Sequence, residues 1–446
     1  MPTAPRNADR PLACIVMAGG KGTRMRSALP KVLHPIWGRP LLSWVIAAVR
    51  EAGAEHVVVV VPPDAADPVA AVADDARTVV QHAQLGTGDA VRCAMPELVG
   101  FAGDVLIVSG DTPLLTGALL RSLVDDHRAA DATATAATFR ADPPGAYGRV
   151  IRTDAGIRIV EAKDATADEL AVDEVNAGLY VIDADALRPA LAGLANDNAQ
   201  GEYYLPDVIP AIAGAGGAVA ASLVDDASLL LGVNTRVELA EAARLLRDRI
   251  IEEHLLAGAG IVDPATTYID AEVVLEPDCV VHPHTILRGR TRLAAGAEAG
   301  PHSVLDDATL EHGAQAGPFA HLRPGSHLHA GARVGAFAET KNAEVGARSK
   351  IPHLSYVGDA TIGEDANIGA GNITANYDGE RKHRTTIGDR VRTGSDCVFV
   401  APVAIGDDAT TGAGSIITED VPAEALAIAR ARQVTKEHYA KRKRDV

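Results

Sequence analysis

The sequence predicts an α/β domain with a mainly parallel sheet, followed by a parallel β-helix. Three observations support this prediction. Short apolar runs alternate with helical patterns over the first part of the chain. A long helical pattern then runs from Arg236 to about Leu256. Beyond it, aliphatic residues recur at every sixth position, a period that fits neither a helix nor a sheet with one wet face.

Three apolar runs in the first part have the character of strands buried on both faces. They are Leu12–Ala18, Val57–Val61 and Val105–Val108, all continuous and rich in branched side chains. A helical pattern at Leu41–Ala52 separates the first two runs. Alternation of this kind builds a parallel sheet covered by helices, in which ligands bind at the carboxyl ends of the strands.

The pattern from Arg236 to Leu256 predicts a long amphipathic helix that connects two domains. Two glycines that follow it would end the helix. We therefore expect domains at residues 1–235 and 261–446, joined by a linker helix at 236–260. The apolar face of the helix is expected to carry Val237, Ala240, Leu245, Ile250 and Leu255.

The six-residue period predicts that each unit forms one short strand and a corner, and that three units close one coil. The aliphatic residue would point into the coil. Aromatic residues make up only 3% of the chain, so we expect the coil interior to exclude rings. A five-residue step is expected between Ala299 and Val304. The inward positions are expected at Ile269, Leu275, Val281, Leu287, Leu293, Ala299, Val304, Leu310, Ala316, Leu322, Leu328, Val334, Ile387, Thr393, Phe399, Ile405 and Thr411.

Two segments interrupt the period, one between Val334 and Val345 and the other at Ile368–Ile387. Insertions in a solenoid protrude as loops and often carry function. Two histidine pairs, His282/His284 and His327/His329, have the spacing of metal ligands. We expect them at solvent-facing corners of the coil rather than at a metal site.

Composition and charge exclude several classes of protein. The chain has 42 basic and 59 acidic residues, and a net charge of −17 argues against nucleic-acid binding. Its four cysteines form no C-x-x-C pair, so neither a zinc knuckle nor a disulfide framework is indicated. No apolar stretch reaches the roughly 18 residues of a membrane span, so we expect a cytoplasmic protein without stable membrane association. The basic run Lys441–Arg444 is interpreted as a solvated terminus.

A glycine-rich loop follows the first predicted strand, with the sequence Gly19-Gly20-Lys21-Gly22-Thr23-Arg24-Met25, and Pro30-Lys31 comes shortly after. Glycines let backbone N–H groups approach phosphate oxygens, and Lys21, Arg24 and Lys31 would add positive charge. The loop is neither a P-loop nor a dinucleotide fingerprint, because both need glycines at other positions. A second motif, Ser109-Gly110-Asp111, follows the third strand.

The loop resembles the signature of sugar-1-phosphate nucleotidylyltransferases. Together with the hexapeptide half, the chain is similar to a bacterial family that combines N-acetylglucosamine-1-phosphate uridylyltransferase with glucosamine-1-phosphate acetyltransferase. The resemblance covers Leu12 to about Arg432. It implies a Rossmann-like uridylyltransferase domain at 1–235 and a left-handed β-helix with the acetyltransferase at 261–446.

In the first domain, the resemblance implies a site for UTP, N-acetylglucosamine-1-phosphate and Mg²⁺. Arg24 and Lys31 would be catalytic because they neutralise the phosphates, and Asp111 with Asn234 would hold the metal. Tyr203 and Tyr204 would line the pocket. The nucleotide- and sugar-binding positions would be Met17, Ala18, Gly19, Gly20, Lys31, Gln81, Gly86, Thr87, Ser109, Gly110, Asp111, Gly148, Glu161, Asn176 and Asn234.

In the second domain, the resemblance implies that His353 is the general base for acetyl transfer and that Glu339 orients it. A histidine near its ordinary pKa suits removal of a proton from an amine. The positions implied for the sugar phosphate are Arg323, Lys341, Tyr356 and Asn367. Those implied for acetyl-CoA are Ala370, Asn376, Tyr377, Ser395, Ala413 and Arg430.

The resemblance thus implies a bifunctional enzyme that supplies UDP-N-acetylglucosamine for envelope synthesis and forms homotrimers through the β-helix. Two other readings stay open. One is a nucleotidylyltransferase of different base or sugar specificity with a regulatory β-helix, against which the His353 neighbourhood and the Asn376-Tyr377 loop argue. The other is a non-catalytic scaffold, against which the intact glycine-rich loop and Gly110-Asp111 argue.

Overall fold

The computed structural model describes residues 10–20, 22–153, 156–198 and 200–442 of the chain. It divides into two compact units, Met1–Leu246 and Arg247–Val446, with the boundary inside helix α8 (Arg236–Leu256). None of the helices in these described ranges is long and apolar enough to cross a bilayer. The end of the basic run Lys441–Arg444 and the loop residue Lys21 lie outside the described residues.

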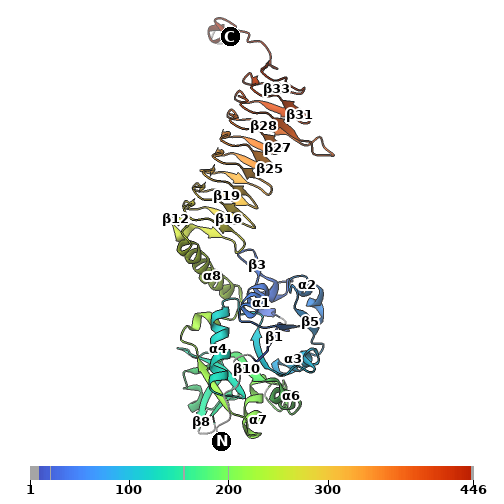
Figure 1. The fold of residues 1–446 in the computed structure, drawn as a ribbon, viewed down its shortest axis with the longest axis vertical. Helices are drawn as coiled ribbons and strands as arrows, with labels where there is room; N and C mark the ends of the chain where they lie inside the picture. The colour runs from blue at the N-terminus through green and yellow to red at the C-terminus, as the bar shows by residue number, and fades with distance from the viewer. Residues whose placement is uncertain (1–9, 21, 154–155, 199, 443–446) are drawn as a thin grey trace. The chain divides into compact units, whose positions relative to one another are not determined.

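The first unit is built on a nine-stranded sheet in which the three expected strands lie side by side (Figure 1). Its path is β11-β7-β10-β6-β1-β4-β5, and β8 and β9 extend it from β10. Strand β1 pairs in parallel with both β4 and β6, whereas β10 runs antiparallel to its neighbours. The bounds are β1 Leu12–Met17, β4 His56–Val61, β5 Arg77–Val80, β6 Asp104–Ser109, β7 Ala134–Arg140, β8 Arg149–Thr153, β9 Gly156–Val160, β10 Glu174–Asp183 and β11 Val219–Leu223.

Helices cover both faces of this sheet, because successive side chains of each strand point to opposite faces. Along β1, Cys14 and Val16 enter one core and Ala13 and Ile15 enter the other. The first core is completed by α1 (Leu41–Glu51), α2 (Ala66–Ala70) and α4 (Gly117–Ala129), and the second by α3 (Thr87–Ala94), α6 (Ala184–Ala192) and α7 (Val208–Gly214). The prediction of an α/β layered domain is confirmed.

Helix α8 has the expected bounds, but the expected apolar face is only partly right, because Ile250 is buried whereas Ala240 is exposed. Val237 is 79% exposed and Leu255 is 41% exposed. The buried side chains of its first part are Ala242 and Leu246, one turn apart, which join a small cluster with Met25. The packing partner therefore selects which of the aliphatic residues of the helix are buried, and the sequence of the helix alone does not identify them.

The second unit is a parallel β-helix with three ladders of short strands, as the six-residue period predicted. The first ladder contains β12 Gly260–Ile261, β15 Val280–Val281, β18 Glu298–Ala299, β21 Gln315–Ala316, β24 Arg333–Ala336 and β26 Lys350–His353. The second contains β13 Tyr268–Ile269, β16 Ile286–Arg288, β19 Val304–Asp306, β22 His321–Leu322, β25 Glu339–Val345, β27 Tyr356–Ile362, β28 Ile373–Ala375, β30 Val398–Val400 and β33 Ile416–Ile417. The third contains β14 Val274–Leu275, β17 Arg292–Leu293, β20 Thr309–Leu310, β23 His327–Leu328, the ends of β25 and β27, β29 Thr385–Ile387 and β31 Val403–Ile405.

Two expectations for the coil are wrong, one about its register and one about rings in its interior. Leu305, not Val304, is the inward residue, because Leu305 pairs with Leu287 and is completely buried. The short step therefore follows Leu305, where Asp307 makes the corner with a positive φ of 44°. The coil interior also accepts a ring, since Phe399 is inward and only 1% exposed.

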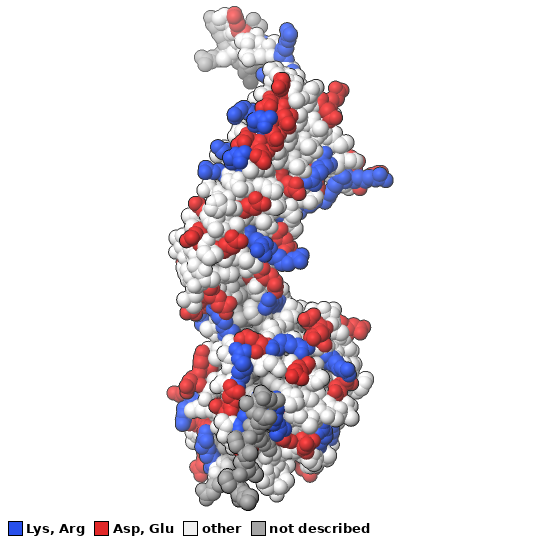
Figure 2. All heavy atoms as spheres, in the orientation of Figure 1, with Lys and Arg blue, Asp and Glu red and all other residues white. Residues whose placement is uncertain are grey.

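Of the two interrupted segments, only the second protrudes as a loop, and the expectation is wrong for the first, which is formed by the end of β24 and by β25. Strands β25 and β27 are each seven residues long and continue through two ladders. The segment between β28 and β29 projects from the side of the coil (Figure 1) and is closed by a bridge between Tyr377 and Lys382. Figure 2 shows acidic and basic side chains gathered on the last coils, where Arg348 pairs with Asp365 and Arg390 with Asp408.

Candidate active sites

A cavity of about 450 Å³ lies at the carboxyl ends of β1 and β6 in the first unit. This is where an α/β sheet of this kind binds its ligands. Ten of the expected nucleotide- and sugar-binding residues line it, namely Met17, Ala18, Gly19, Gly20, Lys31, Gln81, Gly86, Thr87, Ser109 and Asp111. The sequence analysis assigned no role to four other lining residues, Val32, Gln84, Ala90 and Glu202. Of these, Gln84 and Glu202 stand close in sequence to the expected residues Gly86 and Tyr203, whereas the two apolar residues carry no chemical signal.

A cluster of opposite charges and one amide lies at the edge of this cavity. The Lys31 ammonium contacts the Asp111 carboxylate, and its Nζ lies 2.9 Å from Asn234 Oδ1. Arg24 donates to the same Asn234 oxygen at 3.0 Å. Residues from three distant parts of the chain therefore meet at one point, and among them are Asp111 and Asn234, which the resemblance implied as metal ligands.

Local structure fixes each member of this cluster. Gly110 donates its backbone N–H to Met17 at the end of β1, and Ser109 donates its hydroxyl to Asp111 at 2.7 Å. The Asp111 carbonyl accepts the N–H of Val233, which brings the next residue, Asn234, beside the carboxylate. Lys31 begins a 3₁₀ turn behind Pro30. The charged side chains are therefore held by backbone contacts and not only by each other.

Gln81 forms the opposite wall and is held in one orientation. Its amide nitrogen donates to Asp89 at 2.8 Å and to the Gly86 carbonyl at 3.1 Å. Its carbonyl oxygen lies against Gly19 so closely that a Cβ there would approach it to 2.6 Å. Gly86, with φ +103°, would place a Cβ 2.7 Å from the Tyr203 carbonyl. Glycine is therefore required at Gly86 by both conformation and space.

Three expected sugar-binding residues, Gly148, Glu161 and Asn176, lie close to one another but are not among the residues that line the cavity. Asn176 donates its N–H to the Gly148 carbonyl at 2.8 Å, and a Cβ on Gly148 would lie 3.4 Å from Glu161 Oε1. Burial, and then the charges of Asp164 and Asp207, raise the pKa of Glu161. A carboxyl group whose pKa is raised in this way is a candidate ligand-binding group.

Tyr203 and Tyr204, which were expected to line the pocket, lie at the rim of the first site. Tyr203 pairs with Leu85 through its backbone, and the Arg92 guanidinium lies over its ring at 4.4 Å. Tyr204 is almost fully buried and its hydroxyl accepts from Gln200 at 2.8 Å. Both tyrosines therefore support the wall of the cavity without lining it.

In the second unit, His353 lies at a corner of the coil that directly follows β26. The same corner of the next coils carries Ala370, Ser395 and Ala413. Backbone hydrogen bonds join these corners, from Gly371 to His353, from Asp396 to Ala370 and from Gly414 to Ser395. Arg430 continues the row, because its Cδ would lie 3.6 Å from a Cβ on Gly414. The structure thus aligns the expected base with four of the six positions expected for acetyl-CoA.

Most of the other expected residues lie on the face that follows this corner. Arg323, which directly follows β22, lies next to β25, where Lys341 is paired with Gly358 of β27 and Glu339 with Tyr356. Glu339 pairs with Arg323 at 2.9 Å. The His353 side chain has no hydrogen-bond partner among the described residues, so this single chain does not form the expected Glu339–His353 contact. Asn367 lies on the preceding face, between Lys350 and Arg392.

The sequence analysis missed Asp359, which is the hub of this face. It is 8% exposed and accepts hydrogen bonds from Asn342 at 2.8 Å and from Asn376, while Lys341 lies 3.4 Å away. Burial raises the pKa of Asp359, but the two amides and the ammonium outweigh burial, so the pKa lies below its ordinary value. The signal available in the sequence was an aspartate within the region where the six-residue repeat is broken.

Comparisons with known proteins agree with this arrangement. Residues 14–205 match the MobA-like NTP transferase domain, and residues 384–419 match the hexapeptide repeat of succinyl-transferase. The bifunctional protein GlmU of Streptomyces avermitilis is 48% identical over 98% of this chain and 96% of its own length. The GlmU protein of Trichlorobacter lovleyi is 45% identical over 97% of this chain and 99% of its own length. That of Geobacter sulfurreducens is 46% identical, also over 97% of this chain and 99% of its own length. Identity at this level along both units shows that the chain belongs to the family of bifunctional GlmU proteins.

Proposed function

We propose that the cavity at Lys31, Asp111 and Asn234 is the uridylyl-transfer site and that the corner at His353 is the acetyl-transfer site. The chain is a bifunctional enzyme. It acetylates glucosamine-1-phosphate with acetyl-CoA, then transfers UMP from UTP to the product and releases diphosphate and UDP-N-acetylglucosamine. This product feeds synthesis of the cell envelope. The observation that carries the assignment is the convergence of Lys31, Arg24, Asp111 and Asn234 at the carboxyl ends of the sheet.

For uridylyl transfer, a phosphate oxygen of the sugar attacks the α-phosphorus of UTP, and the bond to the departing diphosphate breaks. Two anions approach one another, so positioning and charge stabilisation are the main demands. Lys31 and Arg24 supply positive charge at the cavity edge. The N–H of Ala18 already donates to the carbonyl of Val60, so it is not free to bind a phosphate. The phosphates are therefore bound by the N–H groups of the glycines that follow. Gln81 and the Gly86-Thr87 turn bind uracil.

The residues at the cavity edge also fit a magnesium ion. Carboxylate and amide oxygens are the ligands that Mg²⁺ prefers. The oxygens of Asp111 and Asn234 both contact the single ammonium of Lys31, so the two can share one cation. Asp111 and Asn234 would hold the ion, which would offset the charge of the phosphates when bound. Lys31 would then turn toward the phosphates as the ion takes its place.

For acetyl transfer, the amine of glucosamine-1-phosphate attacks the thioester carbonyl of acetyl-CoA. A C–N bond forms and the C–S bond breaks. His353 accepts the proton that the amine loses and returns it to the departing sulfur, so CoA leaves as the thiol. The corner row from Ala370 to Arg430, with Asn376 and Tyr377 in the projecting segment, binds acetyl-CoA. Arg323, Lys341 and Tyr356 on the adjoining face bind the sugar phosphate.

The enzyme works as a homotrimer in this proposal, with acetyl-transfer sites shared between β-helices. An exposed apolar row on consecutive corners supports association, with Phe319 45%, Phe337 61% and Leu354 64% exposed. His353 stands next to this row and lacks a side-chain partner among the residues described in one chain. We place the enzyme in the cytoplasm, where UTP and acetyl-CoA are available. Light scattering at micromolar concentration should give the mass of three chains.

The two assignments are tested with one pair of variants. Asp111→Ala should abolish uridylyl transfer and leave acetyl transfer intact. His353→Ala should lower kcat for acetyl transfer by roughly 10²–10⁴-fold and leave uridylylation of supplied N-acetylglucosamine-1-phosphate intact. Normal uridylyl transfer by the Asp111 variant would refute the first site. A raised KM with near-normal kcat in the His353 variant would show that the histidine only binds substrate.

A further inference from the structure

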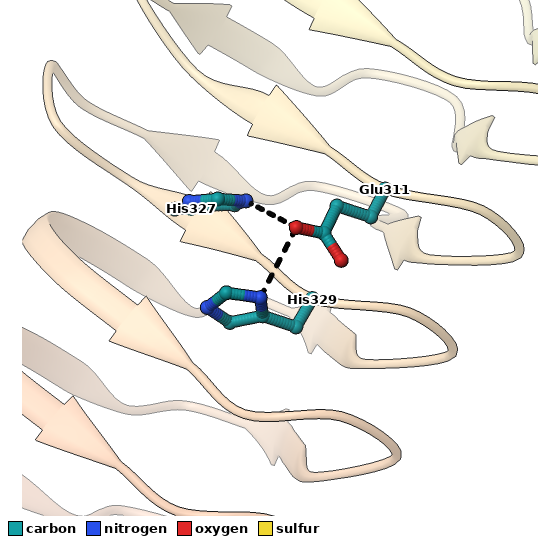
Figure 3. Close-up of side chains that lie close together, drawn as sticks. All are labelled: Glu311, His327 and His329. Atoms are coloured by element: carbon teal, nitrogen blue, oxygen red, sulfur yellow. Dashed lines mark hydrogen bonds and ion pairs between the residues drawn. The ribbon is translucent and has the colours of Figure 1, made fainter.

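Three metal-ligating side chains meet on the outer face of the coil, away from both sites described above. Glu311 follows β20, His327 lies in β23 and His329 follows that strand (Figure 3). Strands β20 and β23 belong to successive coils and pair in parallel, with Thr309 opposite His327. The histidines were expected at solvent-facing corners, which is wrong for His327 because it lies within β23, whereas His329 leads into the turn that follows the strand. They occupy a strand and its end, where all three side chains are partly buried.

The ligand atoms converge on one point. Glu311 Oε1 lies 2.9 Å from His327 Nε2 and 3.1 Å from His329 Nδ1, as Figure 3 shows. All three atoms lie within 4.8 Å of one another. The two imidazole rings are stacked with centroids 4.3 Å apart and an angle of 25° between their planes. Two neighbouring coils therefore present a carboxylate and two imidazoles in the same small volume.

This spacing is close to that of a tetrahedral zinc site. Zinc binds histidine nitrogen and carboxylate oxygen at about 2.0–2.2 Å, so two ligands at a tetrahedral angle lie roughly 3.3 Å apart. The two distances to Glu311 need to lengthen by only a few tenths of an ångström. The second oxygen of Glu311 accepts the N–H of Ala330 at 3.1 Å, which fixes the orientation of the carboxylate. Such outer hydrogen bonds are a regular feature of metal ligands.

We propose that Glu311, His327 and His329 form a binding site for Zn²⁺ or a similar divalent transition-metal ion. Imidazole ligands select these ions over Mg²⁺ and Ca²⁺, which prefer oxygen. The side chains are 39%, 36% and 37% exposed, so solvent can reach the fourth position of the ion. The ion links one coil to the next, and its binding stabilises the folded β-helix through mass action.

The test uses the full chain, stripped of metal with a chelator and then dialysed against Zn²⁺ in buffer that contains Mg²⁺. Zinc per chain is measured by mass spectrometry, and the thermal midpoint of the β-helix is measured with and without zinc. Wild type should bind one more zinc ion per chain than His327→Ala or His329→Ala. Loss of an outer-shell partner already weakens metal sites by about 10–100-fold, so loss of a direct ligand should cost at least about 100-fold in affinity.

His282→Ala is the matched control. His282 lies 3.7 Å from Glu298 on an earlier part of the coil, and within the part of the chain that the structure describes no third metal-ligating group joins this pair. This variant should bind zinc as wild type does. Equal zinc content and equal zinc-dependent stabilisation in wild type and both cluster variants would overturn the proposal. If an alanine variant fails to fold, Glu311→Gln keeps the shape of the side chain and should still lose the zinc-dependent stabilisation. Acetyl and uridylyl transfer report separately on the proposed function.

Discussion

Substitution of Gly22 by alanine should impair uridylyl transfer, although this residue does not line the cavity. Gly22 precedes the 3₁₀ turn Thr23–Met25 with φ +58°, in the left-handed region. A Cβ there would lie 2.8 Å from Cβ of Lys31, close to its backbone. Lys31 or the loop must therefore move, and the ammonium loses its position between Asp111 and Asn234.

Two magnitudes follow from this geometry. A left-handed alanine costs about 1–2 kcal/mol of folding free energy. A misplacement of about 1 Å in a positioning contact can cost roughly 10²-fold in rate, so we expect kcat/KM for uridylyl transfer to fall about 100-fold. Release of diphosphate from UTP and N-acetylglucosamine-1-phosphate measures this rate. Acetyl transfer in the same preparation should be unchanged.

Gly53→Ala separates backbone strain from the displacement of Lys31. Gly53 has φ +92° and follows helix α1, and an added Cβ would meet no heavy atom of the described residues within 4 Å. This variant should lose similar stability in thermal unfolding and keep wild-type uridylyl transfer. Equal uridylyl rates in the two variants would refute the reasoning, because Lys31 would then not depend on the space that Gly22 leaves.

Three further outcomes are expected. Phe399→Ala should lower the free energy of unfolding of the β-helix by about 3–5 kcal/mol in denaturant titrations, because the ring is 1% exposed, whereas its neighbour Val400, 38% exposed, should tolerate alanine. Asp359→Asn should raise KM for glucosamine-1-phosphate about tenfold in steady-state kinetics, since it removes the charge that holds Lys341. Glu161→Gln should raise the thermal midpoint at pH 7. The pKa of Glu161 is raised in the folded protein, so its contribution to stability is complete below the ordinary value of 4.5 and is lost as pH rises through the folded pKa. The difference in thermal midpoint between this variant and wild type should therefore vanish below pH 4.5.

The sequence predicted the elements whose signal is carried by their own residues. Continuous runs such as Val57–Val61 predict strands buried on both faces, and the six-residue period predicts coils, whatever else the chain contains. Features that depend on a partner were predicted less well. The buried face of α8 is selected by Met25 and its neighbours, and the short step after Leu305 depends on the corner that Asp307 can adopt.

The same distinction holds for the sites. Asp111 was predictable because strand ends meet at one edge of a parallel sheet, and its motif follows β6 directly. The role of Asp359 depends on Asn342 and Asn376, which approach it from neighbouring coils. Contacts between coils also bring Glu311 to His327, and the spacing of the histidines alone does not predict a carboxylate between them.

The proposed trimer with shared acetyl-transfer sites implies that acetyl transfer depends on assembly and uridylyl transfer does not. The cavity proposed for uridylyl transfer is lined by residues of one unit, and Lys31 and Asp111 already pair at its edge. His353 instead stands on an exposed corner without a side-chain partner among the described residues, and Glu339 is engaged by Arg323. On dilution, acetyl transfer per chain should therefore fall at the concentration where light scattering shows dissociation, while uridylyl transfer stays constant. Phe337→Glu, which charges the apolar row, should move both the dissociation and the loss of acetyl transfer to higher concentration. Full acetyl transfer by separated chains would show that one β-helix supplies every group the reaction needs.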